Sequence, residues 1–133
     1  MNLDFGWQFK LVRSDVQPAQ INFHSSDVQD VDLPHDVQVS QPWMKPAPGE
    51  RADFSDQAAK VKSRVSARAF KEMGSGAYRR VLHVPAEWKG RRLVLDFGGI
   101  MLVGDVYLNG ERIGGTDYGY VGFGIDITDK VRY

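Results

Sequence analysis

The chain has 133 residues, no cysteine, and 17 basic residues balanced by 17 acidic ones. This length suits a single domain over 1–133, and the lack of cysteine excludes a disulfide-held fold. Because the charges are interspersed, the sequence lacks the basic stripe of a nucleic-acid-binding or anionic-membrane surface. No apolar run reaches the roughly 20 residues that span a bilayer. Composition therefore predicts a soluble domain that binds neither nucleic acid nor a membrane, and leaves a periplasmic or secreted location open.

The N-terminal half carries short β patterns that prolines interrupt. Apolar side chains alternate from Phe5 to Leu11, which predicts a short strand. A second strand is predicted over 31–34, where Pro34 ends it because proline cannot donate to a central ladder. From 42 to 73 prolines and sparse apolar positions predict a long loop, with at most one or two helical turns near 57–61.

The C-terminal half has the clearer pattern. A β-prone run extends from Tyr78 to Val84 and stops at Pro85. Residues 91–97 then alternate, which places Leu93, Leu95 and Phe97 on the side of a core.

Asn109-Gly110 lies between two β-prone flanks and predicts a tight antiparallel hairpin with a type I′ turn. We expect the glycines that follow to relieve crowding in a bulged, closely packed β segment. Short strands separated by turns predict an antiparallel all-β sandwich or barrel. The glycines concerned are Gly114, Gly115, Gly119, Gly122 and Gly124.

Self-sufficient catalysis finds no support in the sequence. His24, His35 and His83 are scattered, and none lies in a nucleophile-elbow context, so we expect structural or surface histidines. Three separate histidines without cysteine make no metal site, and the glycines make no phosphate loop. We therefore predict no metal, no cofactor and no catalytic residue in this chain.

Carbohydrate binding fits better. Sugar sites set aromatic rings against the apolar faces of sugars, and carboxylates accept from their hydroxyls. Trp43, Trp88, Tyr118 and Tyr120 lie in predicted loops or turns, and Asp117 stands beside two of them. A structural alternative stays open, in which Trp88 caps the edge of the sandwich and Tyr120 packs inward.

An ordered set of motifs from about Leu3 to the C-terminus resembles the N-terminal region of family 2 glycoside hydrolases. Each motif alone is weak, and their order makes the resemblance specific. The matching segments are Leu33-Pro34-His35-Asp36, Gly76-Ala77-Tyr78-Arg79-Arg80, Val84-Pro85-Ala86-Glu87-Trp88-Lys89-Gly90, Leu95-Asp96-Phe97-Gly98-Gly99-Ile100, Val106-Tyr107-Leu108-Asn109-Gly110 with Ile113-Gly114-Gly115, and Gly119-Tyr120 through Phe123 to Asp126-Ile127-Thr128.

The resemblance implies a jelly-roll β-sandwich of the galactose-binding-domain-like type. In the family's enzymes an immunoglobulin-like domain follows, and then a (β/α)8 barrel whose two glutamates perform a retaining hydrolysis. Those glutamates are absent from this chain. The closest likeness is to β-galactosidases, whose N-terminal domain lends loop residues to the rim of the barrel's pocket. β-Glucuronidases and β-mannosidases share the domain.

By the same resemblance, Asp117 matches in type and place an aspartate that reaches the sugar, and Tyr118 lies beside it. A second contact in the family comes from an amide-bearing residue shortly before the G-x-Y segment. Met73 stands near that point here. The substrate-binding candidates are therefore Asp117, Tyr118 and Met73.

Three functions stay open: a domain that shapes a β-galactoside pocket, a stand-alone carbohydrate-binding module, and a purely structural domain. Since the family continues into further strands after the D-I-T motif, we expect the sandwich to lack its last strands. An exposed sheet edge would then predict a homo-oligomer.

Overall fold

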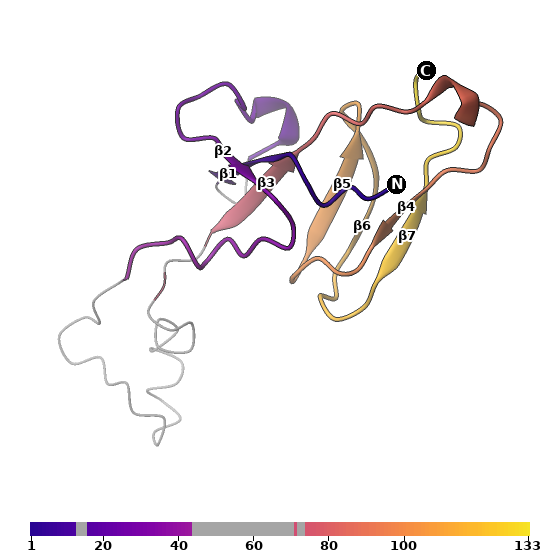
Figure 1. Ribbon diagram of the computed structural model, residues 1–133. Coiled ribbons are helices and arrows are strands. Elements are labelled where there is room, and N and C mark those ends of the chain that lie inside the picture. The colour runs from indigo at the N-terminus through magenta and orange to yellow at the C-terminus, as the bar shows by residue number, and fades with distance from the viewer. Residues whose placement is uncertain (13–15, 44–70, 72–73) are drawn as a thin grey trace. The chain divides into compact units, whose positions relative to one another are not determined.

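The computed structural model describes residues 1–12, 16–43, 71 and 74–133, which form two compact units, Met1–Arg80 and Val81–Tyr133 (Figure 1). Regular structure in the described residues is mainly β-strand, with short 3-10 turns at Pro18–Gln20 and Ala86–Trp88. The predicted all-β class is therefore confirmed. The helical turns predicted near 57–61 and the candidate Met73 lie outside the described residues. Within the described part of the chain, no helix is long and apolar enough to cross a membrane.

The first unit is built on an antiparallel sheet of order β2-β1-β3. Its strands are β1 (Trp7–Val12), β2 (Gln29–Val31) and β3 (Ser75–Arg79). The central strand β1 pairs Phe9 with Gln29 on one side and with Tyr78 on the other. The strand predicted from Phe5 to Leu11 is thus present over Trp7–Val12 and lies in the middle of its sheet, whereas Phe5 lies in an exposed bend before it.

The core of this unit is an aromatic cluster around Phe9, which is only 1% exposed. The centroid of its ring lies 4.6 Å from that of His35 and 5.1 Å from that of Tyr78. His35 Nδ1 and the Tyr78 hydroxyl are 2.7 Å apart, at hydrogen-bond distance. This bond satisfies the polar groups of two partly buried side chains. His35 and Tyr78 each belong to one of the motifs described above, and both contribute to the core.

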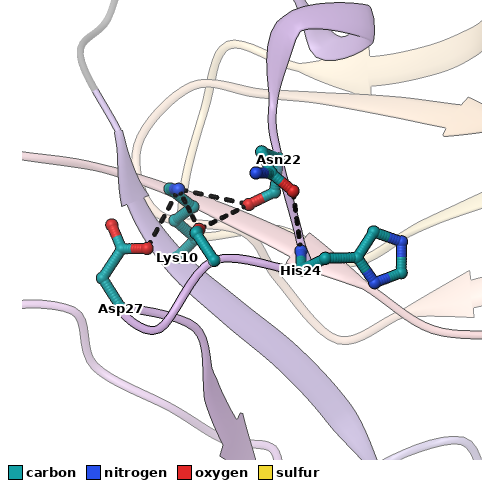
Figure 2. A network of polar contacts seen from close by, with 5 residues as sticks. Lys10, Asn22, His24 and Asp27 are labelled. Carbon is teal, nitrogen blue, oxygen red and sulfur yellow. Dashed lines mark hydrogen bonds and ion pairs between the residues drawn. The ribbon is translucent and has the colours of Figure 1, made fainter.

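A polar network fixes the connection between β1 and β2 (Figure 2). Lys10 Nζ donates to the Asn22 carbonyl at 3.1 Å, to Ser25 Oγ at 2.6 Å and to Asp27 Oδ1 at 3.1 Å. Hydrogen bonds from Ser25 and from Lys10 lower the pKa of Asp27. The His24 amide donates to Asn22 Oδ1 at 2.9 Å while its ring points away (Figure 2). Lys10 therefore has a structural partner for each of its three donors.

The second unit contains two antiparallel strand pairs. Strand β4 (Val94–Phe97) pairs with β7 (Phe123–Asp126), and β5 (Gly104–Leu108) pairs with β6 (Glu111–Thr116). Phe97 and Phe123 are cross-strand partners whose rings stack at 5.0 Å. Ile127, 3% exposed, is the most buried apolar side chain described in this unit. Leu93, Leu95 and Phe97 are half-buried and Val94 and Asp96 exposed, as the alternation predicts.

The turn between β5 and β6 confirms the predicted hairpin. Asn109 and Gly110 both have positive φ, 50° and 85°, which a type I′ turn requires. A register shift between Val106 and Tyr107 marks the expected bulge. A Cβ at Gly114 would lie 2.7 Å from Ile125 Cδ1, so this glycine lets the β7 side chain approach β6. The expectation of close packing is confirmed here.

Two strand predictions extended too far. The β-prone run from Tyr78 to Val84 holds a strand only to Arg79, because β3 is as long as its pairing with β1. Beyond it, the Arg80 guanidinium donates to the carbonyls of Leu3 and Phe5 instead of continuing a ladder. Strand β2 ends at Val31, and the Leu33 amide donates to the Asp4 carbonyl at 2.7 Å outside the ladder.

Candidate functional site

The candidate site lies on the connection between β6 and β7, residues 117–122, which we call the acidic loop. The connection between β4 and β5, residues 98–103, forms what we call the apolar loop. Gly104 pairs with Thr116 and Phe97 pairs with Phe123, so both loops leave the same end of the strand pairs (Figure 1). The second unit thus presents two neighbouring loops at one end.

Thr116 fixes the start of the acidic loop. The Tyr118 amide donates to Thr116 Oγ1 at 3.1 Å, and that hydroxyl donates back to the Tyr118 carbonyl at 3.0 Å. These bonds close a short turn around Asp117. The backbone around Asp117 and Tyr118 is therefore held by local hydrogen bonds.

Asp117, Tyr118 and Tyr120 are all exposed. Tyr118 and Tyr120 are 58% and 73% exposed, and their ring centroids lie 5.8 Å apart at an interplanar angle of 58°. The alternative in which Tyr120 packs inward is wrong, since the turn over 119–121 directs this side chain to solvent. Among the described residues, no hydrogen bond or ion pair occupies the Asp117 carboxylate.

Gly119 brings the two loops together. A Cβ on this residue would lie 2.6 Å from Met101 Sδ, 3.1 Å from Met101 Cα and 3.4 Å from Leu102 Cα. A Cβ at Gly99 would lie 3.4 Å from the Gly119 carbonyl oxygen. The absence of side chains at both positions lets the acidic loop rest on the backbone of the apolar loop.

The other aromatic candidates, Trp43 and Trp88, have surroundings of their own. Trp43, in the first unit, is exposed, and Lys71 Nζ lies 4.5 Å from its ring centroid. Trp88 is half-buried in a 3-10 turn, and its carbonyl accepts from the Tyr133 hydroxyl at 3.3 Å. That placement suits the structural alternative for Trp88. The structure unites Asp117 with Tyr118 and Tyr120, and does not describe Met73.

The three histidines have different surroundings in the described part of the chain. His35 belongs to the aromatic core, whereas His24 and His83 are exposed. Burial, and then the charge of Asp36, raises the pKa of Tyr78. No cluster of three metal-ligating side chains occurs among the described residues.

Sequence reasoning missed the apolar loop. Met101, Leu102 and Val103 are consecutive and exposed by 61%, 60% and 72%. The signal was present as a run of four apolar residues, Ile100 to Val103, between glycines at 99 and 104. Such a run suggests a buried strand, and only the structure places it in a loop.

Comparison with known proteins gives the family. The model of the glycosyl hydrolase 2 galactose-binding domain-like family matches residues 61–133, more than half of the chain. A β-glucuronidase of Bacteroides fragilis is 43% identical over 60 residues, 45% of this chain and 9% of that protein. A β-galactosidase of Bacteroides ovatus is 28% identical over 127 residues, 96% of this chain and 13% of that protein.

The fold matches solved structures as well. A family 2 glycosyl hydrolase of Bacteroides cellulosilyticus superposes with a TM-score of 0.67 at 25% identity, over 100% of this chain and 16% of that one. The all-β chain with its acidic loop is therefore a galactose-binding-like β-sandwich of the glycoside hydrolase class. It belongs to the galactose-binding domain-like family of glycosyl hydrolase 2 proteins. It spans only 9–16% of the length of these relatives.

Proposed function

We propose that this chain, over 1–133, is the N-terminal accessory domain of a family 2 glycoside hydrolase of β-galactosidase type. In this proposal the acidic loop lends Asp117 and Tyr118 to the rim of a pocket whose catalytic glutamates lie elsewhere in the enzyme. The observation that supports it most directly is the exposed Asp117, followed by the two exposed tyrosines Tyr118 and Tyr120, on a loop of a galactose-binding-like unit.

The chemistry of the loop suits a neutral sugar. A carboxylate accepts hydrogen bonds from sugar hydroxyls, and charge-assisted bonds are stronger than neutral ones. Exposed tyrosine rings offer flat apolar faces against which the C–H side of a pyranose packs, together with a hydroxyl for a polar contact. The turn made by Thr116 reduces the entropy lost when the loop binds.

Relatives of both specificities resemble the chain, under the names β-galactosidase and β-glucuronidase. A glucuronide carries a carboxylate, which the charge of Asp117 would repel, whereas a galactoside is neutral. This electrostatic difference favours a galactoside as the substrate of the intact enzyme.

Asp117→Ala tests the pocket role in the full-length glycosidase. We expect kcat/KM for an aryl β-galactoside to fall by about tenfold or more, the loss of one charge-assisted hydrogen bond. Asp129→Ala is the matched control, since Asp129 is an exposed aspartate of the same unit. Equal kinetics in both variants would contradict the proposal.

A stand-alone carbohydrate-binding module is the second candidate, and the exposed Tyr118–Tyr120 pair favours it. Under the main proposal most of the pocket lies outside this chain, so galactose should bind the 133-residue chain more weakly than about 1 mM. Calorimetric titration with galactose or lactose measures this. Micromolar binding that Tyr120→Ala abolishes would favour the module.

A further inference from the structure

Asp117 lies on a part of the acidic loop whose two ends are held in different ways. On the N-terminal side, Thr116 is the last residue of β6, and its hydroxyl bonds both polar backbone groups of Tyr118. On the C-terminal side, Gly119 rests on the backbone of the apolar loop, since a Cβ there would lie 3.1 Å from Met101 Cα. Asp117 and Tyr118 therefore lie between a point held by hydrogen bonds and a point held by packing.

The end of the acidic loop is packed as well. A Cβ at Gly122 would lie 3.0 Å from the Phe97 carbonyl oxygen and 3.5 Å from that of Gly98. The next residue, Phe123, begins β7 and pairs with Phe97. From Gly119 onward, close backbone packing and strand pairing therefore hold the loop, and neither depends on a side-chain hydroxyl.

The carboxylate of Asp117 is exposed, and no hydrogen bond or ion pair orients it among the described residues. Its direction therefore follows from the backbone at this position. That backbone is fixed on its C-terminal side by the two bonds between Thr116 and Tyr118. A binding group acts best when the residues around it hold its geometry before the ligand arrives.

The hydroxyl of Thr116 is already used in this turn. A threonine hydroxyl has one proton, and here it is donated to the Tyr118 carbonyl at 3.0 Å, while the Tyr118 amide donates to the same oxygen at 3.1 Å. The Thr116 side chain is half-buried, whereas Asp117 and Tyr118 are exposed. Thr116 has no proton left for a sugar, so its influence on a ligand would pass through the two residues that follow it.

We propose that Thr116 is a positioning residue of the sugar-contact site: by bonding the Tyr118 backbone, its hydroxyl sets the direction in which Asp117 presents its carboxylate. This inference rests on the proposed function and adds to it a residue that does not touch the substrate. Loss of the hydroxyl leaves the loop packed at Gly119 and Gly122, so the fold persists while the segment around Asp117 gains freedom. The sugar contact then requires more ordering, which weakens it.

A double-mutant cycle in the full-length glycosidase tests the positioning role. Thr116→Val removes the hydroxyl at nearly constant side-chain shape, and we expect kcat/KM for an aryl β-galactoside to fall about three- to tenfold. In the Asp117→Ala background the same change should lower kcat/KM by less than about twofold, because the group that it positions is gone. Thr116→Ser keeps the hydroxyl and should stay within about twofold of the unchanged enzyme. An equally large effect of Thr116→Val with and without Asp117 overturns the proposal.

A matched control separates positioning from stability. Thr128→Val also removes a hydroxyl that bonds the backbone of the second unit, since Thr128 Oγ1 accepts from the Leu93 amide at 2.9 Å. Assayed well below the melting temperature, it should lower Tm and leave kcat/KM unchanged. A loss of kcat/KM in Thr128→Val as large as in Thr116→Val overturns the proposal.

Hydrogen exchange in the 133-residue chain tests the turn without any substrate. Thr116→Val should speed exchange of the Tyr118 amide by about threefold or more, because that amide loses its acceptor at 3.1 Å. Thr116→Ser should leave the rate unchanged. An exchange rate that Thr116→Val does not alter overturns the proposal.

The kinetic outcomes distinguish the two proposals. Normal kinetics of Asp117→Ala contradict the sugar contact itself, and the positioning role with it. A reduced kcat/KM in Asp117→Ala together with a normal value in Thr116→Val contradicts the positioning role alone.

Discussion

Asp126 closes the second unit at the end of β7. Its Oδ1 accepts from the Thr128 amide at 3.0 Å and from Thr128 Oγ1 at 2.6 Å, and its Oδ2 accepts from Arg92 Nε at 2.8 Å. Thr128 Oγ1 accepts in turn from the Leu93 amide at 2.9 Å. The hydrogen bonds of Asp126 and Thr128 thus fix the backbone on both sides of the buried Ile127.

The hydrogen bonds of Asp126 predict that the stability of the fold depends on pH. Bonds from Thr128 and then Arg92 lower the pKa of Asp126 from 3.8 to about 2. Since the folded-state pKa is depressed, the stabilisation is complete above the unfolded-state value near 3.8 and disappears as the pH falls through about 2. Between pH 3.8 and about pH 2, we expect Tm to fall less in Asp126→Asn than in the unchanged protein. Melting curves at a series of pH values measure it, and identical slopes in both proteins would contradict it.

Tyr78 makes the polar contact of the aromatic core. Tyr78→Phe keeps the ring and leaves His35 Nδ1 without its partner at 2.7 Å, so we expect a loss of about 1 kcal/mol in the free energy of unfolding. Urea denaturation measures it. Tyr107→Phe, at an exposed tyrosine, should change stability by less than about 0.5 kcal/mol. An equal effect in both variants would show that the hydroxyl at Tyr78 contributes nothing.

At the scale of elements, the β5–β6 hairpin depends on its turn. Gly110 has a φ of 85°, and an alanine there would cost about 1–2 kcal/mol through clash of its Cβ with the backbone. We expect Gly110→Ala to lower the free energy of unfolding by that amount. Gly98→Ala is the control, because a Cβ there meets nothing within 4 Å. Comparable losses in the two variants would argue against a turn-specific cost.

The hairpin was predictable from sequence because its signal is local. Asn109-Gly110 fixes the turn, and the turn sets the pairing around it. The β-prone run after Tyr78 shows the opposite case. Its length as a strand depends on β1, which lies some 65 residues away along the chain and pairs only as far as Arg79. Local propensity could not reveal that limit.

Only part of the candidate site was predictable from the sequence. The position of Asp117 and Tyr118 just after the hairpin predicted an exposed loop, and the structure has one there. The contact of Gly119 with Met101 depends on two separate strand pairs leaving the same end of the unit. No spacing in the sequence reports that proximity, so the apolar loop was missed.

At the scale of the whole enzyme, the charge of Asp117 bears on the choice between a neutral and an anionic sugar substrate. In the proposed rim, the charge of Asp117 would accept hydrogen bonds from galactoside hydroxyls and would repel a glucuronide carboxylate. Asp117→Asn keeps the shape of the side chain and removes this charge. Its effect on two substrates therefore separates charge from geometry.

We expect Asp117→Asn in the full-length enzyme to lower kcat/KM for an aryl β-galactoside by roughly tenfold, as a charge-assisted bond becomes a neutral one. For the matching β-glucuronide, kcat/KM should stay constant or rise, because a repulsion is removed. Asp129→Asn, an exposed aspartate outside the loop, should change neither value. Parallel losses on both substrates would mean that Asp117 acts through loop structure, and a loss only on the glucuronide would exclude the galactoside assignment.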